Sequence, residues 1–507
     1  MRHYDWLGHH AFATPDSPCW TDLHSDRSFT FIKADDRCRR LAAHLQRHCA
    51  VKRGDRVAVL AMNSTDVMEV HSACAKIGAI FVPLNWRLVA DEIDFIVGDC
   101  APQVLIHDGS TAEIVAALTA HVPHLVETTG GGAASPYEDA ISASDGAYVP
   151  ETMSHADTWT MMYTSGTTGR PKGAPNTYGM AFWNAVNLGV PSTVGPDSVG
   201  LTMLPLFHTG GLNTYTTVLL HAGGHSLIMR AFDPGTALDL LSDPDRAVSH
   251  FLVVPAMYLF MSQHPGFAEA DFSGIKVAAV GGAPTPVPVL EAYKAKGLPI
   301  VQGFGMTETS PCVSIQTAET AFAKPGSAGR AAMHCDLKIV REDGVDAAPD
   351  EVGELWVRGE NITPGYWRRP EANAKEFVDG WFRTGDAARI DPDGDLWIVD
   401  RWKDMYISGG ENVYPAEVEN VLYALDGVAE AGVVGMEDDR WGEVGVAFIA
   451  RTEGASLHED DVIGACQGRM ARFKVPARVV FIEALPRNAT GKVLKRELRL
   501  LLDSADT

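Results

Sequence analysis

The chain has 507 residues, of which 46% are apolar and 21% charged, enough for a large core and more than one domain. Its formal net charge of −23 disfavours nucleic acid or an anionic membrane as a partner, because the overall field repels polyanions. The longest strongly apolar stretch, residues 250–261, contains a proline and is too short to span a bilayer, which takes about 20 residues.

The N-terminal segment carries His, Asp and Pro where a signal peptide needs an apolar run, so we expect a cytoplasmic protein. The eight cysteines form no C-x-x-C pair, which argues against a zinc site or a redox dithiol and favours buried, unreactive thiols.

From residue 28 to residue 108, helical patterns alternate with short apolar runs, and the alternation continues through the middle of the chain. This pattern is typical of α/β layers around a largely parallel sheet, whose strand ends carry ligand sites. After residue 331 the sequence pattern predicts mostly strands, and an Asp-Gly pair within 388–400 predicts the turn of a hairpin. We therefore expect an α/β N-terminal domain with a small β-rich subdomain over 1–400, and a small α+β domain over 401–507.

A Gly- and hydroxyl-rich loop, YTSGTTGRPKG at 163–173, follows one of the predicted strands. Its glycines allow backbone N–H groups to turn inward, and its hydroxyls and Lys172 add donors, which indicates a phosphate-binding loop. It is not a Walker A motif. The alternative is a flexible surface loop, since Gly, Ser and Thr are common in loops.

This loop resembles the signature of the acyl-adenylate-forming superfamily, which includes acyl- and aryl-CoA synthetases, adenylation domains and firefly-type luciferases. The resemblance extends over nearly the whole chain, although the first 150 residues agree only in general pattern. It implies that the triphosphate of ATP contacts Thr164, Ser165, Gly166, Thr167, Thr168, Gly169 and Lys172.

Two more strand ends match the family's nucleotide site, GGAP at 281–284 and QGFGMTE at 302–308. The resemblance implies that Phe304 stacks on adenine, where relatives usually have Tyr, that Thr307 lies near the α-phosphate, and that Glu308 helps to hold Mg²⁺. Asp386 and Arg401 match positions that contact the ribose. The remaining expected nucleotide contacts are Gly282, Ala283, Pro284, Gly303, Gly305 and Met306.

The C-terminal segment PRNATGKVLKREL carries Lys492, which matches the lysine that the family inserts into the site for adenylation. The alternative is a surface lysine on a basic helix, as we expect for Lys495. In the family the small domain then rotates about a hinge, here matched by Lys403. Its new face is implied to bind CoA through Ser408, Gly409, Gly410 and Trp441, with Gly410 lining a narrow tunnel, although a Trp more often packs than binds ligand.

His208, with Gly210 and Gly281, matches the side of the acyl pocket. Amino-acid-activating relatives place an Asp at the His208 position to pair with the substrate ammonium, so His208 favours a fatty, aryl or short functionalised acid. A structural histidine is the alternative.

We expect an AMP-forming acyl-CoA synthetase that uses ATP, Mg²⁺ and coenzyme A, with Lys172, Thr307, Glu308 and Lys492 in catalytic roles. Its small-molecule partners are then a carboxylic acid, ATP and CoA, and the enzyme is a monomer or a homodimer. The alternatives are transfer to a carrier-protein thiol, luciferase-like oxidation, and a catalytically inactive adenylate-binding regulator.

Overall fold

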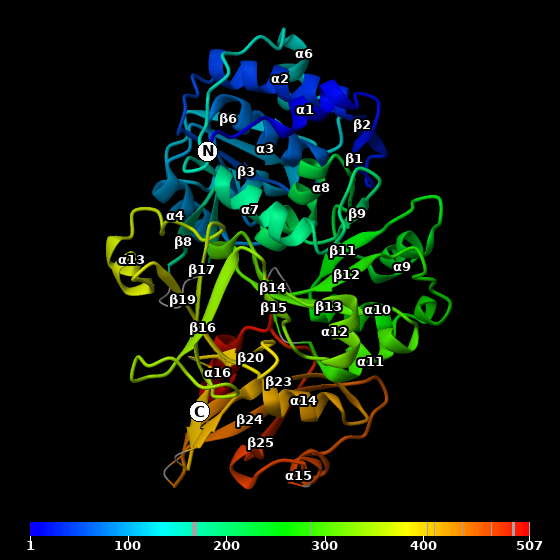
Figure 1. The fold of residues 1–507 in the computed structure, drawn as a ribbon, viewed down its shortest axis with the longest axis vertical. Helices are drawn as coiled ribbons and strands as arrows, with labels where there is room; N and C mark the ends of the chain where they lie inside the picture. Colours follow the sequence, from blue (N-terminus) through cyan, green and yellow to red (C-terminus); the bar gives the residue numbers. More distant parts are fainter. Residues whose placement is uncertain are drawn as a thin grey trace.

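The computed structural model describes residues 1–164, 170–283, 285–402, 404–409, 411–438, 440–467, 469–488 and 492–505. Three sheets and their helices form a large N-terminal part, and a fourth sheet forms a small part set below it (Figure 1). The expected fold class is confirmed. The boundary between residues 400 and 401 stays a prediction.

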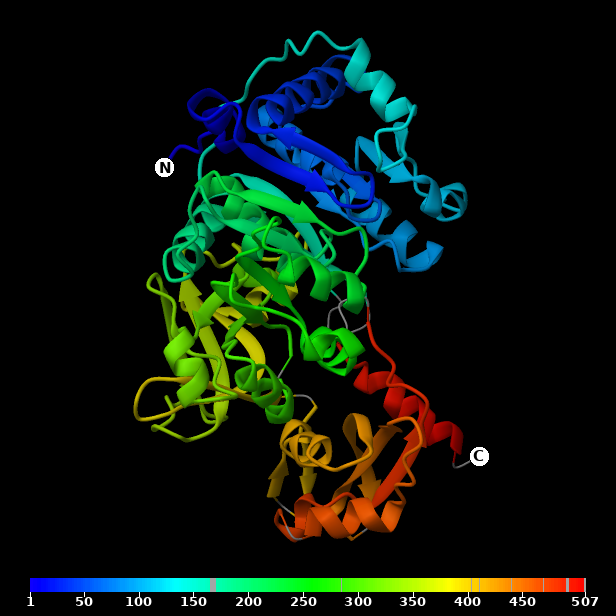
Figure 2. The same cartoon turned by 90° about the vertical axis from the view of Figure 1, so that its right-hand side faces the viewer.

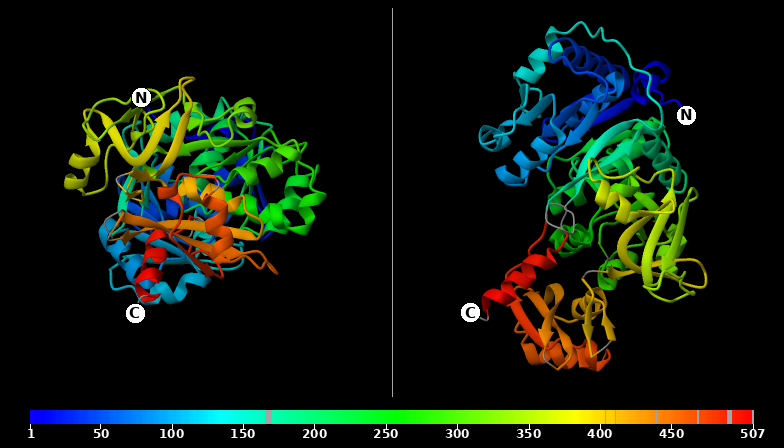
Figure 3. Two further views of the ribbon diagram at one scale, coloured as in Figure 1. Left: turned by 90° about the horizontal axis from the view of Figure 1, so that it is seen from below. Right: turned by 90° about the vertical axis from the view of Figure 1, so that its left-hand side faces the viewer.

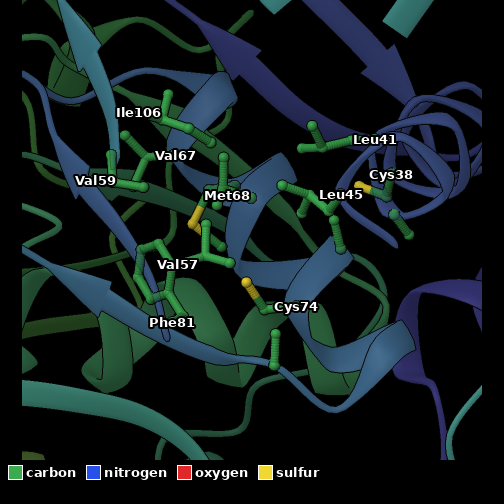
Figure 4. Packing of buried hydrophobic residues seen from close by; sticks show 14 of the residues in the cluster. Cys38, Leu41, Leu45, Val57, Val59, Val67, Met68, Cys74, Phe81 and Ile106 are labelled. Atoms are coloured by element: carbon green, nitrogen blue, oxygen red, sulfur yellow. The ribbon is translucent and has the colours of Figure 1, made fainter. Parts of the chain in front are cut away.

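The first sheet is the α/β layer predicted near the N-terminus, and its strands are parallel except for the last pair. Helix α2 (Phe31–Arg47) buries Ala34, Cys38, Leu41 and Leu45, which recur at helical spacing along one face. These side chains pack toward Val57, Val59 and Met68 in the core (Figure 4). In spatial order the strands are β6 (His124–Thr128), β5 (Val104–Asp108), β3 (Arg56–Leu60), β4 (Ile80–Pro83), β7 (Thr158–Thr164) and β8 (Lys172–Thr177).

The second sheet has nine strands and includes two from the N-terminus that the sequence patterns did not reveal. Strand β1 pairs in parallel with β10, so the first residues of the chain complete a sheet built from its middle. In spatial order the strands are β15 (Arg330–Ala331), β14 (Cys312–Ile315), β13 (Ile300–Gly305), β12 (Val277–Val280), β11 (His250–Val253), β9 (Val199–Thr202), β10 (His225–Ile228), β1 (Pro18–Asp22) and β2 (Arg27–Thr30).

Helices cover both α/β sheets. Four of them, α6, α9, α10 and α11, have Pro in the first turn, where the missing N–H has no helical partner to lose. The helices of this part are α1 (Trp6–Ala13), α3 (Thr65–Ile77), α4 (Ala90–Cys100), α5 (Ala112–Ala116), α6 (Pro136–Ala143), α7 (Tyr178–Gly189), α8 (Thr217–Ala222), α9 (Pro234–Ser242), α10 (Pro255–Gln263), α11 (Val287–Ala295) and α12 (Ala318–Ala323).

The third sheet is the β-rich subdomain predicted after residue 331. Its strands are antiparallel, and the Asp-Gly turn joins β19 to β20 as expected. The elements are β16 (Cys335–Val340), β17 (Gly353–Gly359), α13 (Pro370–Glu376), β18 (Phe377–Val378), β19 (Trp381–Ile390) and β20 (Leu396–Arg401).

The fourth sheet forms the C-terminal part with its helices, and Figures 2 and 3 show it as a separate unit below the rest. Its elements are β21 (Tyr406–Ser408), β22 (Glu411–Val413), α14 (Pro415–Tyr423), β23 (Val428–Asp438), β24 (Gly442–Arg451), α15 (Glu459–Gln467), β25 (Arg478–Ile482) and α16 (Lys495–Ala505). Among the described residues, no helix is long and apolar enough to cross a bilayer. All eight cysteines are free and buried, as expected.

Candidate active site

The predicted phosphate loop joins the antiparallel strands β7 and β8. Thr164 and Lys172 pair across this hairpin, so the two ends of the loop are held together. At its base the Tyr163 hydroxyl donates to Asp99 Oδ2 at 2.7 Å, and the Arg369 guanidinium pairs with Asp99 Oδ1 at 2.7 Å. The other predicted phosphate contacts, Ser165, Gly166, Thr167, Thr168 and Gly169, lie outside the described residues.

Lys172 points toward a carboxylate that the sequence analysis missed. Its Nζ lies 2.7 Å from Glu376 Oε1 and 3.9 Å from the centre of the Tyr366 ring. The Tyr366 hydroxyl is 2.8 Å from Glu308 Oε1 and 2.9 Å from Glu376 Oε2. Burial and the two carboxylates raise the pKa of Tyr366 well above its ordinary value, so it stays a hydrogen-bond donor. Nothing in the local sequence around Tyr366 and Glu376 marked these two residues.

The QGFGMTE segment, residues 302–308, contains the next set of predicted site residues. Phe304 and Gly305 end β13, and Thr307 and Glu308 begin a short 3₁₀ turn, η4 (Thr307–Thr309). Thr307 and Glu308 are buried, at 7% and 4% exposed. Their backbone carbonyls accept hydrogen bonds from Asn176 at 3.2 Å and from the Thr363 N–H at 2.7 Å, respectively. The turn is therefore fixed to β8 and to the chain after β17.

Glycines let these strand ends approach each other closely. A Cβ on Gly305 would lie 1.9 Å from the Pro311 carbonyl oxygen, so no side chain fits there. At Gly303 a Cβ would lie 2.9 Å from the Ser314 oxygen. A Cβ on Gly281 would meet the Gly303 oxygen at 3.6 Å, which places the end of β12 beside β13. Gly282 and Ala283 follow β12, Met306 follows β13, and Pro284 lies outside the described residues.

The two predicted ribose residues pair in register on neighbouring strands. Asp386 of β19 faces Arg401 of β20 across the antiparallel pair. Asp386 is 4% exposed, and its N–H donates to the Thr384 hydroxyl at 3.1 Å. The side chain of Arg401 lies outside what the structure describes.

The segment that carries Lys492 approaches the segment that carries His208, although the two are far apart in sequence. The segment before α16 runs from the small part up to the large part (Figures 2 and 3). There Arg487 and Asn488 line a cavity of about 310 Å³ together with Leu204 and Pro205, which shortly precede His208.

Burial and the charge of Lys492 lower the pKa of His208 from 6.5 to about 4. His208 is therefore neutral near pH 7, and its Nδ1 accepts from the Gly210 N–H at 3.2 Å. Gly210 opens a π-helix, η2 (Gly210–Thr216), that the sequence patterns did not reveal. Segments of this kind occur frequently at functional sites.

The expectation that Lys495 is a surface lysine is wrong. Its side chain is 14% exposed and lies 3.2 Å from Glu419 and 3.5 Å from Asp400. The helical pattern of 492–502 showed a basic helix but not the acidic residues, distant in sequence, that face it. Lys495 thus ties α16 to the end of β20.

The described members of the predicted CoA-binding set, Ser408, Gly409 and Trp441, gather on the small part. Gly409 has φ +63°, its N–H donates to the Trp441 carbonyl at 2.7 Å, and a Cβ there would lie 2.7 Å from the Trp441 ring. Ser408 pairs with Gly442, beside Trp441. Trp441, 36% exposed, borders an open depression. Gly410 and the predicted hinge Lys403 lie outside the described residues.

Comparisons with known proteins cover almost the whole chain. The model of the family described as AMP-binding enzyme matches residues 7–367, and that of the AMP-binding enzyme C-terminal domain matches residues 417–492. A feruloyl-CoA synthase of Amycolatopsis sp is 40% identical over 476 residues, 94% of each chain. An indoleacetate–CoA ligase of Aromatoleum aromaticum is 38% identical over 99% of this chain and 98% of its own.

Solved structures agree with these matches. ATP-bound MatB from Rhodopseudomonas palustris superposes with a TM-score of 0.90 at 29% identity, over 98% of each chain. The o-succinylbenzoate CoA synthetase MenE from Bacillus subtilis, in complex with its acyl-adenylate, superposes with a TM-score of 0.88 at 32% identity, again over 98% of each chain.

Proposed function

Since the chain belongs to the AMP-binding enzyme family, we propose that it activates a carboxylic acid with ATP and transfers the acyl group to coenzyme A. It is an enzyme of the AMP-forming acyl- or aryl-CoA synthetase type, because relatives that are 36–40% identical over nearly its full length are CoA ligases. What we propose beyond this type is the class of acid, coenzyme A as the acceptor, magnesium as the metal, and the roles of individual residues.

In the first step a carboxylate oxygen attacks the α-phosphorus of ATP, and pyrophosphate leaves. Negative charge on the phosphates must be neutralised as this bond breaks. Lys172 lies at the base of the phosphate loop, and Lys492 lies close enough to lower the pKa of His208. We assign Lys172 to the departing phosphates and Lys492 to the carboxylate and α-phosphate.

The residues present fit a magnesium ion held together with the substrate. Mg²⁺ takes oxygen ligands and is usually bound by one or two carboxylates plus substrate phosphates. Glu308 offers a buried carboxylate on a turn whose backbone is fixed by Thr363. When bound, the ion would neutralise phosphate charge, and Glu308 would hold it.

In the second step the thiolate of CoA attacks the acyl carbonyl and AMP leaves. We assign Ser408, Gly409, Gly410 and Trp441 to the CoA side of this step. Ser408, Gly409 and Trp441 lie on the small part, so presenting this side to the adenylate requires that part to turn, with Lys403 as the hinge.

The observation that carries the substrate proposal is that His208 stands where amino-acid-activating relatives place an Asp, because an imidazole, neutral or charged, cannot form that ion pair with an ammonium. We therefore propose an acid without an α-amine. Among the relatives, the feruloyl-CoA synthase and the indoleacetate–CoA ligase favour an aromatic acid.

A panel of acids tests this proposal. Ferulate, indoleacetate, 2-succinylbenzoate, a long-chain fatty acid and an α-amino acid would be assayed for AMP release with CoA, without CoA and with a carrier protein. We expect fast AMP release only with CoA and an acid that lacks the amine. Fast release with the amino acid, or with the carrier protein alone, would contradict it.

A further inference from the structure

The chain between β17 and β18, residues 360–376, contacts both halves of the candidate phosphate site. We call it the connecting segment. On one side it reaches the η4 turn, where the Thr363 N–H donates to the Glu308 carbonyl at 2.7 Å. On the other it reaches β8, where the Trp367 N–H donates to the Gly173 carbonyl at 2.8 Å. Its side chains are therefore held at fixed distances from both Lys172 and Glu308.

Two side chains of this segment join Lys172 to Glu308 in one continuous line of contacts. The order is the Lys172 ammonium, the Glu376 carboxylate, the Tyr366 hydroxyl and the Glu308 carboxylate, with successive distances of 2.7, 2.9 and 2.8 Å. The Tyr366 backbone is itself fixed, because its N–H donates to Asn373 Oδ1 at 2.7 Å. This line brings one cation, at Lys172, and one hydroxyl proton, at Tyr366, to the two carboxylates.

We propose that Glu376 and Tyr366 are positioning residues that couple capture of the triphosphate by Lys172 to capture of the metal by Glu308. This inference rests on the proposed function only in taking ATP as the ligand. With no nucleotide, Glu376 is the counter-ion of Lys172, and the Tyr366 hydroxyl donates to Glu308. When the triphosphate binds, Lys172 exchanges Glu376 for phosphate oxygens.

The exchange follows from the charges. A triphosphate carries more negative charge than one carboxylate, so it competes successfully for the ammonium. Glu376 then loses its counter-ion, and the Tyr366 proton is drawn to it because a charged acceptor attracts a donor more strongly once it is unpaired. Glu308 Oε1 is thereby released from this hydrogen bond and offers its lone pair to the metal.

The alternative is a static ion pair that only fixes the end of α13. The two readings predict opposite effects for Glu376→Gln. If Glu376 competes with the nucleotide, removing its charge tightens ATP binding. If it supports Lys172 in the bound state, or has no role, the same change weakens ATP binding or leaves it unchanged.

ATP binding without acid or metal separates the two readings. Equilibrium dialysis with ATP in EDTA would compare the natural protein with Glu376→Gln and with Glu371→Gln, an equal charge change at an exposed position of the same helix. We expect about threefold to tenfold tighter binding for Glu376→Gln, the range of a partly buried ion pair, and less than twofold for Glu371→Gln. In a Lys172→Ala background the Glu376→Gln effect should fall below twofold. Unchanged or weaker binding in Glu376→Gln would overturn the exchange.

Tyr366→Phe tests the coupling. It keeps the ring under Lys172 and removes the hydroxyl, so Glu308 no longer has to give up that bond. We expect less Mg²⁺ for half-saturation of the ATP complex, measured by calorimetry. Tyr137→Phe removes another buried hydrogen bond, of 2.9 Å between a tyrosine and a glutamate, beside the first sheet. It should leave the Mg²⁺ requirement unchanged. An unchanged or higher Mg²⁺ requirement in Tyr366→Phe would overturn the coupling. Failure of the proposed function would instead appear in the acid panel, as absent AMP release.

Discussion

Replacing His71 with Phe should make the fold less sensitive to mild acid. His71 is 1% exposed and stacks on Trp159 with the ring centroids 4.2 Å apart. Burial lowers its pKa from 6.5 to about 3. In the unfolded chain the pKa returns to about 6.5. Below that pH the unfolded chain binds a proton that the folded chain does not, so the free energy of unfolding falls as the pH falls.

The size of the effect follows from the distance between the pH and the pKa of the unfolded state. At pH 5.5, His71 alone lowers the free energy of unfolding by about 1.4 kcal/mol, and above pH 7.5 its contribution is close to zero. The estimate does not depend on the folded pKa as long as that value stays well below 5.5. His3, which is 9% exposed and has its pKa lowered to about 4, adds a similar loss of its own in every variant compared.

Urea unfolding at pH 7.5 and at pH 5.5 measures this loss in the free energy of unfolding. The natural protein should lose about 1.4 kcal/mol more than His71→Phe between the two pH values. His9→Phe, a matched change at an exposed histidine of α1, should behave like the natural protein. Equal losses in the natural protein and His71→Phe would refute the assignment of the acid sensitivity to this buried imidazole.

Three further changes test the nucleotide site, the second step and the fold. Phe304→Ala should raise the KM for ATP by about fivefold to tenfold with a smaller change in kcat, because base stacking is lost; an unchanged KM would exclude stacking. Gly409→Val, whose side chain would collide with Trp441, should slow thioester formation while ATP–pyrophosphate exchange continues, and equal loss of both would contradict the assignment. Lys324→Gln should lower the melting temperature, because the Lys324 ammonium lies 2.8 Å from each of three carboxylates, Asp391, Asp393 and Asp395; an unchanged temperature would show that these pairs add nothing.

Local patterns were enough to predict the alternation of helices and strands in the N-terminal part and the strand-rich region after residue 331. The turn between β19 and β20 follows from its Asp-Gly pair. What local patterns could not predict depends on contacts that they do not encode. Strand β1 finds its partner β10 about 200 residues away, and in the π-helix η2 no side chain fits at Gly211, where a Cβ would lie against the Pro205 carbonyl.

The same division applies to the candidate site. Thr307, Glu308 and Lys172 were found because they stand in contiguous motifs. Glu376 and Tyr366 were missed because nothing local distinguishes a glutamate at the end of a short helix from a solvated one. Only the fold brings Glu376 to 2.7 Å from Lys172. Lys495 was misread for the same reason, since its partners Asp400 and Glu419 belong to other elements.

The most direct test of the account is carboxylate-dependent ATP–pyrophosphate exchange by Lys492→Ala, with ATP binding measured in parallel. We expect exchange to fall by about a hundredfold to a thousandfold while ATP still binds, because one preorganised charge at the reacting phosphate is lost. Lys495→Ala, on the same segment, should affect stability more than exchange. Exchange that persists at the natural rate in Lys492→Ala would contradict the assignment of this site to adenylate formation.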